Sequence, residues 1–194
     1  MTETRRLFLA LYAPPFPLEL EQRIDAALRG IPGARRTGEA ARHITLAFLG
    51  DVEDGRIAAV KAAARETAHA FAQIPYAFDR LGGFPGRGAR ILAVVGPTPP
   101  ALAALSLDLA RRLRAIGVPS DEKPLRLHLT VGRLRAPAVL PLQPIQEVLG
   151  QAEEIHLYES ELLSAGAHYT VLETWPLSTA LHVDPGPESG EGGD

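Results

Sequence analysis

The sequence predicts an α+β fold with two pseudo-symmetric lobes, each a small, mainly antiparallel sheet with helices outside, facing each other across a central cleft. The first observation is a repeated motif. His-Ile-Thr-Leu at 43–46 recurs 85 positions later as His-Leu-Thr-Val at 128–131, each time inside an apolar run typical of a strand. The second is a repeated context, because apolar runs at 7–11 and 91–95 begin 36 and 37 positions before the two histidines. A helix-like stretch lies between run and motif in both halves, which indicates a diverged duplication of strand, helix and His-x-Thr strand.

The elements of the first half follow from apolar spacing and from the positions of Gly and Pro. In chain order we expect a strand over 5–12, a helix over 17–29 ended by Gly30, a Gly/Arg-rich loop over 31–41, the first motif strand over 42–49, an Ala-rich helix over 53–73 and a short strand over 76–81.

The second half is predicted in the same way. In chain order we expect a loop over 82–88, a strand over 89–95, a helix over 101–116, a connector over 117–124, the second motif strand over 125–134, a short helix near 143–150, and a hairpin of strands 153–163 and 168–177 joined by a turn at 164–167. We therefore predict one domain over 1–180, with repeats at about 5–80 and 89–178 and the hairpin completing the fold. Residues 183–194 are Gly/Pro-rich and acidic, which predicts a disordered tail.

Composition limits the classes of protein that the chain can represent. The 194 residues are 46% hydrophobic and 22% charged, as expected of an ordinary globular protein. The absence of cysteine excludes disulfides, thiolate metal sites and a cysteine nucleophile, and it fits a cytoplasmic protein. Four acidic residues in the last eleven account for the net charge of −3, so the body carries about +1. A neutral body argues against tight duplex binding but allows a local basic cleft. No segment is long enough for a membrane span.

The repeated motif carries the candidate chemistry. Strand alternation places His43 and Thr45 on one face, and His128 and Thr130 on one face likewise. Together they would supply an acid, a base and two hydroxyl donors for an anion, a set that suits metal-free hydrolysis of a phosphodiester. A single His-x-Thr is more often structural than catalytic, and the repeated surroundings make the pair informative. The same alternation puts Phe48 on the apolar face, so we expect Phe48 in the core.

The other histidines are weaker candidates for a catalytic role. We expect His69 on a helix surface, His168 and His182 in solvent, and His156 in a structural role, with a border of the cleft as its alternative. No H-x-x-x-H or H-E-x-x-H spacing occurs, so we predict no metal site and no cofactor.

With these motifs identified, the chain resembles the 2H phosphoesterases, specifically the bacterial and archaeal RNA 2′,3′-cyclic phosphodiesterases once called 2′-5′ RNA ligases. The resemblance extends over about residues 5–178, and Leu127 departs from it, because members often place proline before the second histidine. The matching stretches are 6–11, 43–50, 83–85, 128–133, 157–160 and Tyr169.

The resemblance implies roles for particular residues. It makes His43 and His128 the catalytic pair, Thr45 and Thr130 the phosphate-binding hydroxyls, and Arg133, five positions after the second histidine, a further phosphate ligand. Simple alternation turns Arg133 away from the face of His128. Either a β-bulge redirects it or it is a structural surface residue.

The function that this implies is metal-independent opening of RNA 2′,3′-cyclic phosphates to 2′-phosphomonoesters, with His43 favoured as the acid and His128 as the base. Alternatives are ATP-independent, reversible 2′-5′ RNA ligation and a non-catalytic module that binds RNA ends. The expected partners are RNA 3′ ends or small nucleoside 2′,3′-cyclic phosphates, with no membrane, and we expect a monomer. The Gly-rich segment 82–88 lacks a P-loop pattern and is predicted to be a hairpin or crossover loop. In the alternative it lines the RNA path, with Phe84, Arg87 and Arg90 contacting nucleotide and phosphate.

Overall fold

The structure is a computed structural model that describes residues 3–120, 123–163 and 166–179. The helices are α1 (Leu18–Arg29), the 3-10 helix η1 (Glu39–Ala41), α2 (Asp54–Ala70) and α3 (Pro100–Ala115). The strands are β1 (Thr4–Tyr12), β2 (Arg35–Arg36), β3 (His43–Glu53), β4 (Ile74–Phe84), β5 (Ala89–Val95), β6 (His128–Ala138), β7 (Gln143–Ala152), β8 (Glu154–Leu163) and β9 (Gly166–Pro176).

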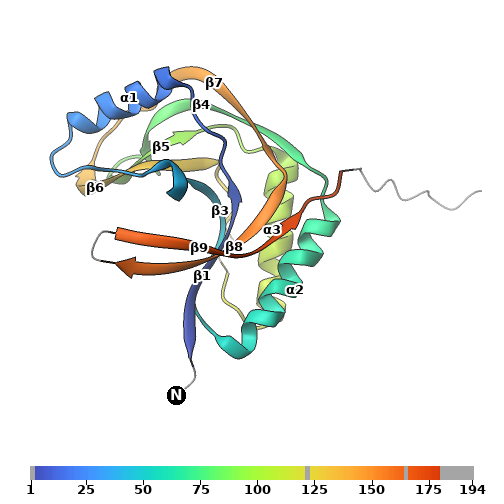
Figure 1. The fold of residues 1–194 in the computed structure, drawn as a ribbon. Helices are drawn as coiled ribbons and strands as arrows, with labels where there is room; N and C mark the ends of the chain where they lie inside the picture. The colour runs from blue at the N-terminus through green and yellow to red at the C-terminus, as the bar shows by residue number, and fades with distance from the viewer. Residues whose placement is uncertain (1–2, 121–122, 164–165, 180–194) are drawn as a thin grey trace, which may run out of the picture.

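The strands form two antiparallel sheets, each with one motif strand (Figure 1). The first sheet has the order β3-β1-β8-β9 and the second the order β2-β6-β5-β4-β7. The two motif strands, β3 and β6, contact each other where the sheets meet. This arrangement confirms the predicted α+β class with two sheets.

The sheets do not coincide with the two halves of the chain. Strand β4 follows the first motif in sequence but pairs with β5 and β7 in the second sheet, whereas β8 and β9 return to the first. The chain therefore passes back and forth between the two sheets, and each sheet contains strands from both halves of the sequence. The proposed repeat boundaries remain a prediction. The predicted tail and residues 164–165 of the predicted turn lie outside what the structure describes, whereas residues 166–167 belong to β9.

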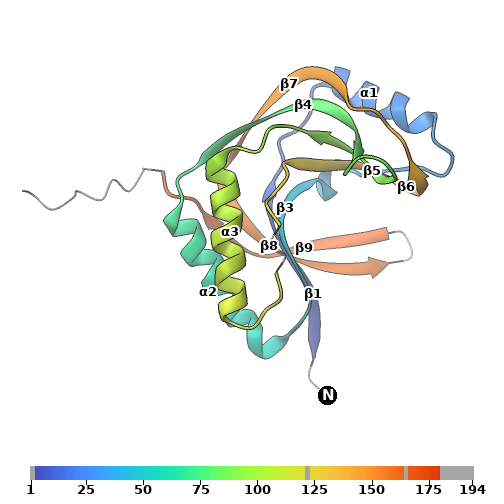
Figure 2. The ribbon, with the colours of Figure 1, turned by 180° about the vertical axis from the view of Figure 1, so that it is seen from behind.

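The helices cover the sheets unequally (Figures 1 and 2). Helix α2 contacts all four strands of the first sheet, and α3 lies beside α2 and contacts β3. Helix α1 packs instead against β2 and β6 of the second sheet. Helix α3 begins with Pro100 in its first turn and buries leucines at helical spacing, namely Leu102, Leu105, Leu109 and Leu113. No helix in the described ranges is long and apolar enough to cross a membrane.

The predicted short helix near 143–150 is wrong, because this segment is strand β7. Ile145, Val148 and Leu149 are spaced as on one face of a helix, but in β7 the side chain of Val148 is buried while that of Leu149 is 71% exposed. Pairing with β4 overrides the local pattern. Since β7 is an edge strand, Pro144 is tolerated within it.

Two predicted loops contain regular structure. Within 31–41 the chain forms β2 and η1, and β4 continues to Phe84, which leaves only 85–88 between β4 and β5. Glycine at 82 is required by packing, because a Cβ there would lie 2.7 Å from the carbonyl oxygen of Pro141. The glycines that resemble a loop signal therefore serve a close approach of two backbones.

Candidate active site

One hollow of about 360 Å³ is lined by residues of both motifs, and we call it the central hollow. Strands β3 and β6, which contact each other, both contribute lining residues. All five residues predicted for the site line it, namely His43, Thr45, His128, Thr130 and Arg133. The structure therefore brings together two motifs that lie far apart in the sequence.

A β-bulge follows the first motif. Thr45 pairs with Ala10 while Ala47 pairs with Leu9, so Leu46 is an extra residue in β3. Leu46 and Ala47 are both buried, and the alternation is reset beyond them. The predicted core position of Phe48 is consequently wrong. Its side chain is 72% exposed and lines the central hollow on the same face as His43.

The second motif has an equivalent bulge. Thr130 pairs with Ala93 and Gly132 pairs with Leu92, which leaves Val131 as the extra residue in β6. Arg133 is thereby redirected into the central hollow, where its charge helps lower the pKa of His43. Of the two alternatives for Arg133, the structure shows the bulge.

Both imidazoles are oriented by the backbone two residues upstream. The Nδ1 atom of His128 lies 2.8 Å from the carbonyl oxygen of Arg126, and the ring of His43 makes an equivalent hydrogen bond to the backbone of Ala41. A carbonyl accepts, so Nδ1 of His128 carries the proton and Nε2 is left for a ligand. A hydrogen bond to the backbone two residues upstream therefore orients both rings.

The surroundings of the two rings differ. His43 lies among three aromatic rings of the first sheet, with centroid distances of 4.7 Å to Phe8, 5.9 Å to Tyr158 and 5.3 Å to Tyr169. His128 stacks on Phe84 at 4.0 Å with planes 10° apart. Sequence reasoning assigned no role to Phe8 or Tyr158. Alternation along β1 could have identified Phe8, because it lies on the face opposite to that of the buried Leu7, Leu9 and Leu11.

The pKa values of both histidines are lowered, chiefly because burial penalises the charged ring. Desolvation brings the pKa of His43 to about 4, with smaller contributions from Arg133 and His128, and the hydrogen bond that the ring donates to the backbone of Ala41 opposes them. Desolvation also lowers the pKa of His128, with the charge of Arg126 adding to it and the Arg126 carbonyl opposing it. In the free protein both rings are neutral at neutral pH, and the large shift is on His43.

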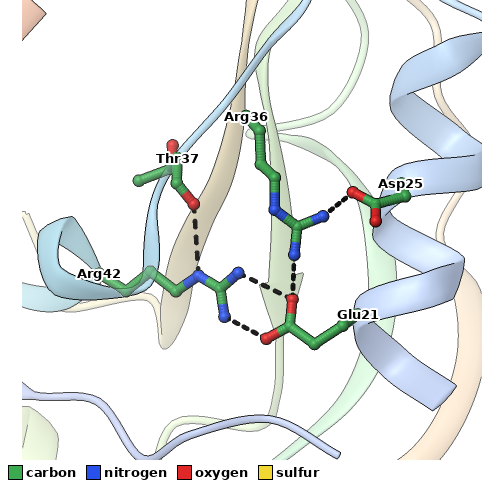
Figure 3. Close-up of polar contacts among 5 residues, drawn as sticks. All are labelled: Glu21, Asp25, Arg36, Thr37 and Arg42. Carbon is green, nitrogen blue, oxygen red and sulfur yellow. Dashed lines mark hydrogen bonds and ion pairs between the residues drawn. The ribbon is translucent and has the colours of Figure 1, made fainter. Parts of the chain in front are cut away.

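A buried ion pair holds the segment that leads into the first motif (Figure 3). Arg42, only 5% exposed, donates two hydrogen bonds to Glu21 of α1, at 2.6 and 2.9 Å, and its Nε donates to the Thr37 carbonyl. Arg42 keeps the pKa of Glu21 below its usual range. Arg36 also pairs with Glu21 and with Asp25. This network fixes the chain next to Ala41, which orients His43.

The same segment joins the two motifs. The amide of Thr37 donates to the carbonyl oxygen of Val131, the bulge residue of β6, at 2.9 Å, and β2 pairs with β6 at Arg35–Arg133. Gly132 allows helix α1 to approach this bulge, because a Cβ there would lie 2.5 Å from Leu28. The segment that precedes His43 is therefore held by hydrogen bonds to β6, the strand that carries His128.

The threonine hydroxyls face the central hollow without structural partners. Among the residues that the structure describes, no hydrogen bond engages the side chain of Thr45 or of Thr130, and both side chains are half-buried. Free hydroxyl donors beside two imidazoles make an anion site possible.

The other histidines that the structure describes do not line this hollow. His156 hydrogen-bonds Thr174 at 2.9 Å and lies near Glu154, which agrees with a structural role. His69 and His168 are exposed, His168 within β9 and not in a turn, and His182 falls outside the described residues. Within the described ranges no three His, Asp or Glu side chains are grouped to hold a metal ion.

Two facing antiparallel sheets with a His-Thr pair from each define a class of protein, the two-histidine phosphoesterase fold. The model of the 2′-5′ RNA ligase superfamily matches residues 11–163. The chain belongs to this superfamily, and the resemblance seen in the sequence is confirmed.

Named relatives and solved structures agree with this assignment. An RNA 2′,3′-cyclic phosphodiesterase of Archaeoglobus fulgidus is 29% identical over 131 residues, which cover 67% of this chain and 73% of the relative. One of Geobacillus stearothermophilus is 29% identical over 191 residues, covering 93% of this chain and 59% of the relative. The crystal structure of TT0787 of Thermus thermophilus, 27% identical, superposes with a TM-score of 0.72 and covers 89% of this chain and 97% of that one.

Escherichia coli LigT, solved with 3′-AMP, has a TM-score of 0.73 over 91% of this chain and 99% of its own. At 23% identity it supports the fold.

Proposed function

We propose that this protein hydrolyses RNA 2′,3′-cyclic phosphate ends to 2′-phosphomonoesters by paired histidine acid–base catalysis. The observation that carries the proposal is the central hollow, where two neutral imidazoles, two free threonine hydroxyls and one arginine converge from both sheets. Relatives that match most of the chain bear the name of this activity. The product isomer and the residue roles are part of the proposal.

The chemistry follows from the two rings. One imidazole accepts a proton from water as its oxygen attacks phosphorus, and the other donates a proton to O3′ as the P–O3′ bond breaks. Thr45, Thr130 and Arg133 donate hydrogen bonds to the non-bridging oxygens, whose charge grows in the transition state. Ring strain in the five-membered cyclic phosphate assists bond cleavage, so the residues present suffice without a metal.

The lowered pKa values bear on which ring is acid and which is base. A base must be unprotonated before the step, and His43, whose pKa of about 4 keeps it neutral at neutral pH, meets that condition. The anionic phosphate raises the pKa of both rings on binding, and His128, without so large a shift, is the one more easily protonated. We therefore propose His43 as the base and His128 as the acid, the reverse of the order favoured from the sequence.

The test uses cytidine 2′,3′-cyclic phosphate in buffer with EDTA. We expect turnover that survives chelation and a 2′-phosphate product identified by phosphorus NMR. Formation of the 3′-phosphate would overturn the product assignment, and loss of activity restored by one divalent metal would overturn metal independence. Saturable binding without turnover would support the non-catalytic RNA-end module instead. A preparation carrying both His43→Ala and His128→Ala controls for contaminating nucleases.

Ligation is the second candidate, and the superfamily description favours it. A 5′-hydroxyl in place of water uses the same proton transfers: the base takes its proton as O5′ attacks phosphorus, the acid protonates O3′ as the P–O3′ bond breaks, and ATP is not required. Incubating a 2′,3′-cyclic RNA end with a 5′-hydroxyl RNA at high concentration, without ATP, tests it. A 2′-5′ linked product supports reversibility, and hydrolysis alone excludes it.

The order of proton transfer has its own test. A substrate with a much better leaving group needs less help from the acid. It should rescue His128→Ala more than His43→Ala if His128 is the acid, and rescue of His43→Ala alone would restore the original order.

A further inference from the structure

A second hollow lies on the other side of the Phe84–His128 stack. It measures about 510 Å³, and we call it the side hollow. Phe84 and Arg126 line it, while His128, in contact with Phe84 at 4.0 Å, lines the central hollow. The stacked rings of His128 and Phe84 therefore each line one hollow, which makes the side hollow a neighbour of the central hollow.

The side hollow is basic. Three arginines, Arg80, Arg87 and Arg126, line it, and none of its described lining residues is acidic. Arg87 is exposed, and within the described ranges no hydrogen bond or ion pair engages it. Arg80 shares only an exposed contact with Asp79 at 3.1 Å. In a body that is close to neutral, this local excess of guanidinium groups favours an anion.

The same hollow offers flat and apolar surface. Phe84 is half-buried, and the Arg126 guanidinium lies over its ring at 4.5 Å. Val139 and Leu142 line the same hollow, and their side chains are 70% and 44% exposed. Arginine and aromatic planes with apolar edges are what single-stranded nucleotides stack upon, whereas the phosphate between them needs a cation.

We propose that the side hollow binds the nucleotide preceding the cyclic end of an RNA, so that an RNA strand end is preferred to a free cyclic mononucleotide. This inference rests on the proposed function. The terminal cyclic phosphate sits between His43 and His128, and the chain continues from the 5′ oxygen of the same ribose. Arg87 then faces the linking phosphate, and the preceding base stacks on the guanidinium plane of Arg126 beside the apolar side chains of Val139 and Leu142.

The experiment compares two substrates on one enzyme. Cytidine 2′,3′-cyclic phosphate fills only the central hollow, whereas the dinucleotide CpC with a 2′,3′-cyclic end reaches both. We expect kcat/KM for the dinucleotide to be about 10-fold higher or more, since one stacked base contributes about 1–3 kcal/mol. Equal efficiency on both substrates would overturn the inference while leaving the proposed function intact, and turnover of neither would remove both.

Arg87→Ala locates the effect. We expect it to raise KM for the dinucleotide about 5–10-fold with little change in kcat, and to leave the mononucleotide kinetics as they are. Losing one phosphate contact should also reduce the slope of log KM against log salt by about 0.7 for the dinucleotide. Arg87→Lys should recover part of the loss. The matched control is Arg65→Ala, an exposed arginine on α2 that lines neither hollow. Equal losses on both substrates would overturn the assignment of Arg87.

Discussion

The two motif strands, β3 and β6, have a similar backbone geometry but present different side chains to the central hollow. In β3 and in β6 the bulge falls on the residue after the threonine, and each turns the residue five positions beyond its histidine into the central hollow. In β3 that residue is Phe48, and in β6 it is Arg133. The two strands thus have an equivalent bulge at the same place in the motif, and they direct different side chains into the hollow.

The same contrast applies to the two imidazoles. His43 sits among aromatic rings in the first sheet and has its pKa lowered to about 4, whereas His128 stacks on one ring and lies near Arg126. The proposed acid–base catalysis requires one ring to be neutral and the other protonated, and different proton affinities favour that state. Symmetric strands with asymmetric surroundings meet that requirement. The following changes test this comparison, from the largest expected effect to the smallest.

Loss of either ring should have the largest effect. His43→Ala and His128→Ala should each lower kcat about 10²–10⁴-fold, because each removes one proton transfer. Steady-state kinetics on cytidine 2′,3′-cyclic phosphate measure this, and the melting temperature checks that the fold is retained. Near wild-type turnover by either variant would rule out a mechanism that uses both histidines.

Much of this arrangement is predictable from sequence. The repeated His-x-Thr strands and the buried leucines of β1 follow from alternation, and the two-sheet class follows from the repeat. Alternation is local, so a short window of sequence contains it. The central residues of the site were accessible for the same reason.

The faces of Phe48 and Arg133 were not predictable by alternation alone. A bulge is set by register with a partner strand, and β1 and β5 lie more than 30 residues upstream of the motifs. Strand β7 was missed for a similar reason, because its pairing with β4 overrides a helical spacing of apolar residues. Long-range pairing, and not local composition, decided these positions.

The threonines should have the next largest effect. Thr45→Val and Thr130→Val retain shape and strand propensity but remove the hydroxyl. We expect kcat to fall about 10–10³-fold, more than KM rises, as when one oxyanion donor is lost. Both kinetics and melting temperature are measured on the same preparations. Variants that melt early yet turn over normally at low temperature would show that the threonines are structural.

The equivalent positions Phe48 and Arg133 test the asymmetry directly. Arg133→Ala should lower kcat/KM about 10²-fold, because it removes a charged donor close to the phosphate. Phe48→Ala should cost less than about tenfold, since an aromatic edge contributes packing and not charge. Arg133→Lys should recover part of the activity. Equal losses at the two positions would mean that the halves contribute alike, contrary to the comparison.

The smallest expected effect concerns acid stability. The pKa of His43 is about 4 in the folded protein against 6.5 for an unperturbed histidine. As pH falls below 6.5 the unfolded chain binds a proton that the folded chain does not, so the free energy of unfolding decreases until about pH 4. At pH 5 this linkage is worth about 2 kcal/mol. The glutamine in His43→Gln does not titrate, so between pH 7 and pH 5 this variant should lose about 2 kcal/mol less stability than the wild type in urea unfolding.

His128→Gln is the comparison variant. Its loss of stability between pH 7 and pH 5 should also be smaller than that of the wild type, but by less than for His43→Gln, because the pKa of His128 is lowered without so large a shift. Equal acid losses in the wild type and His43→Gln would show that His43 is protonated in the folded protein, and the asymmetry between the two rings would then be absent.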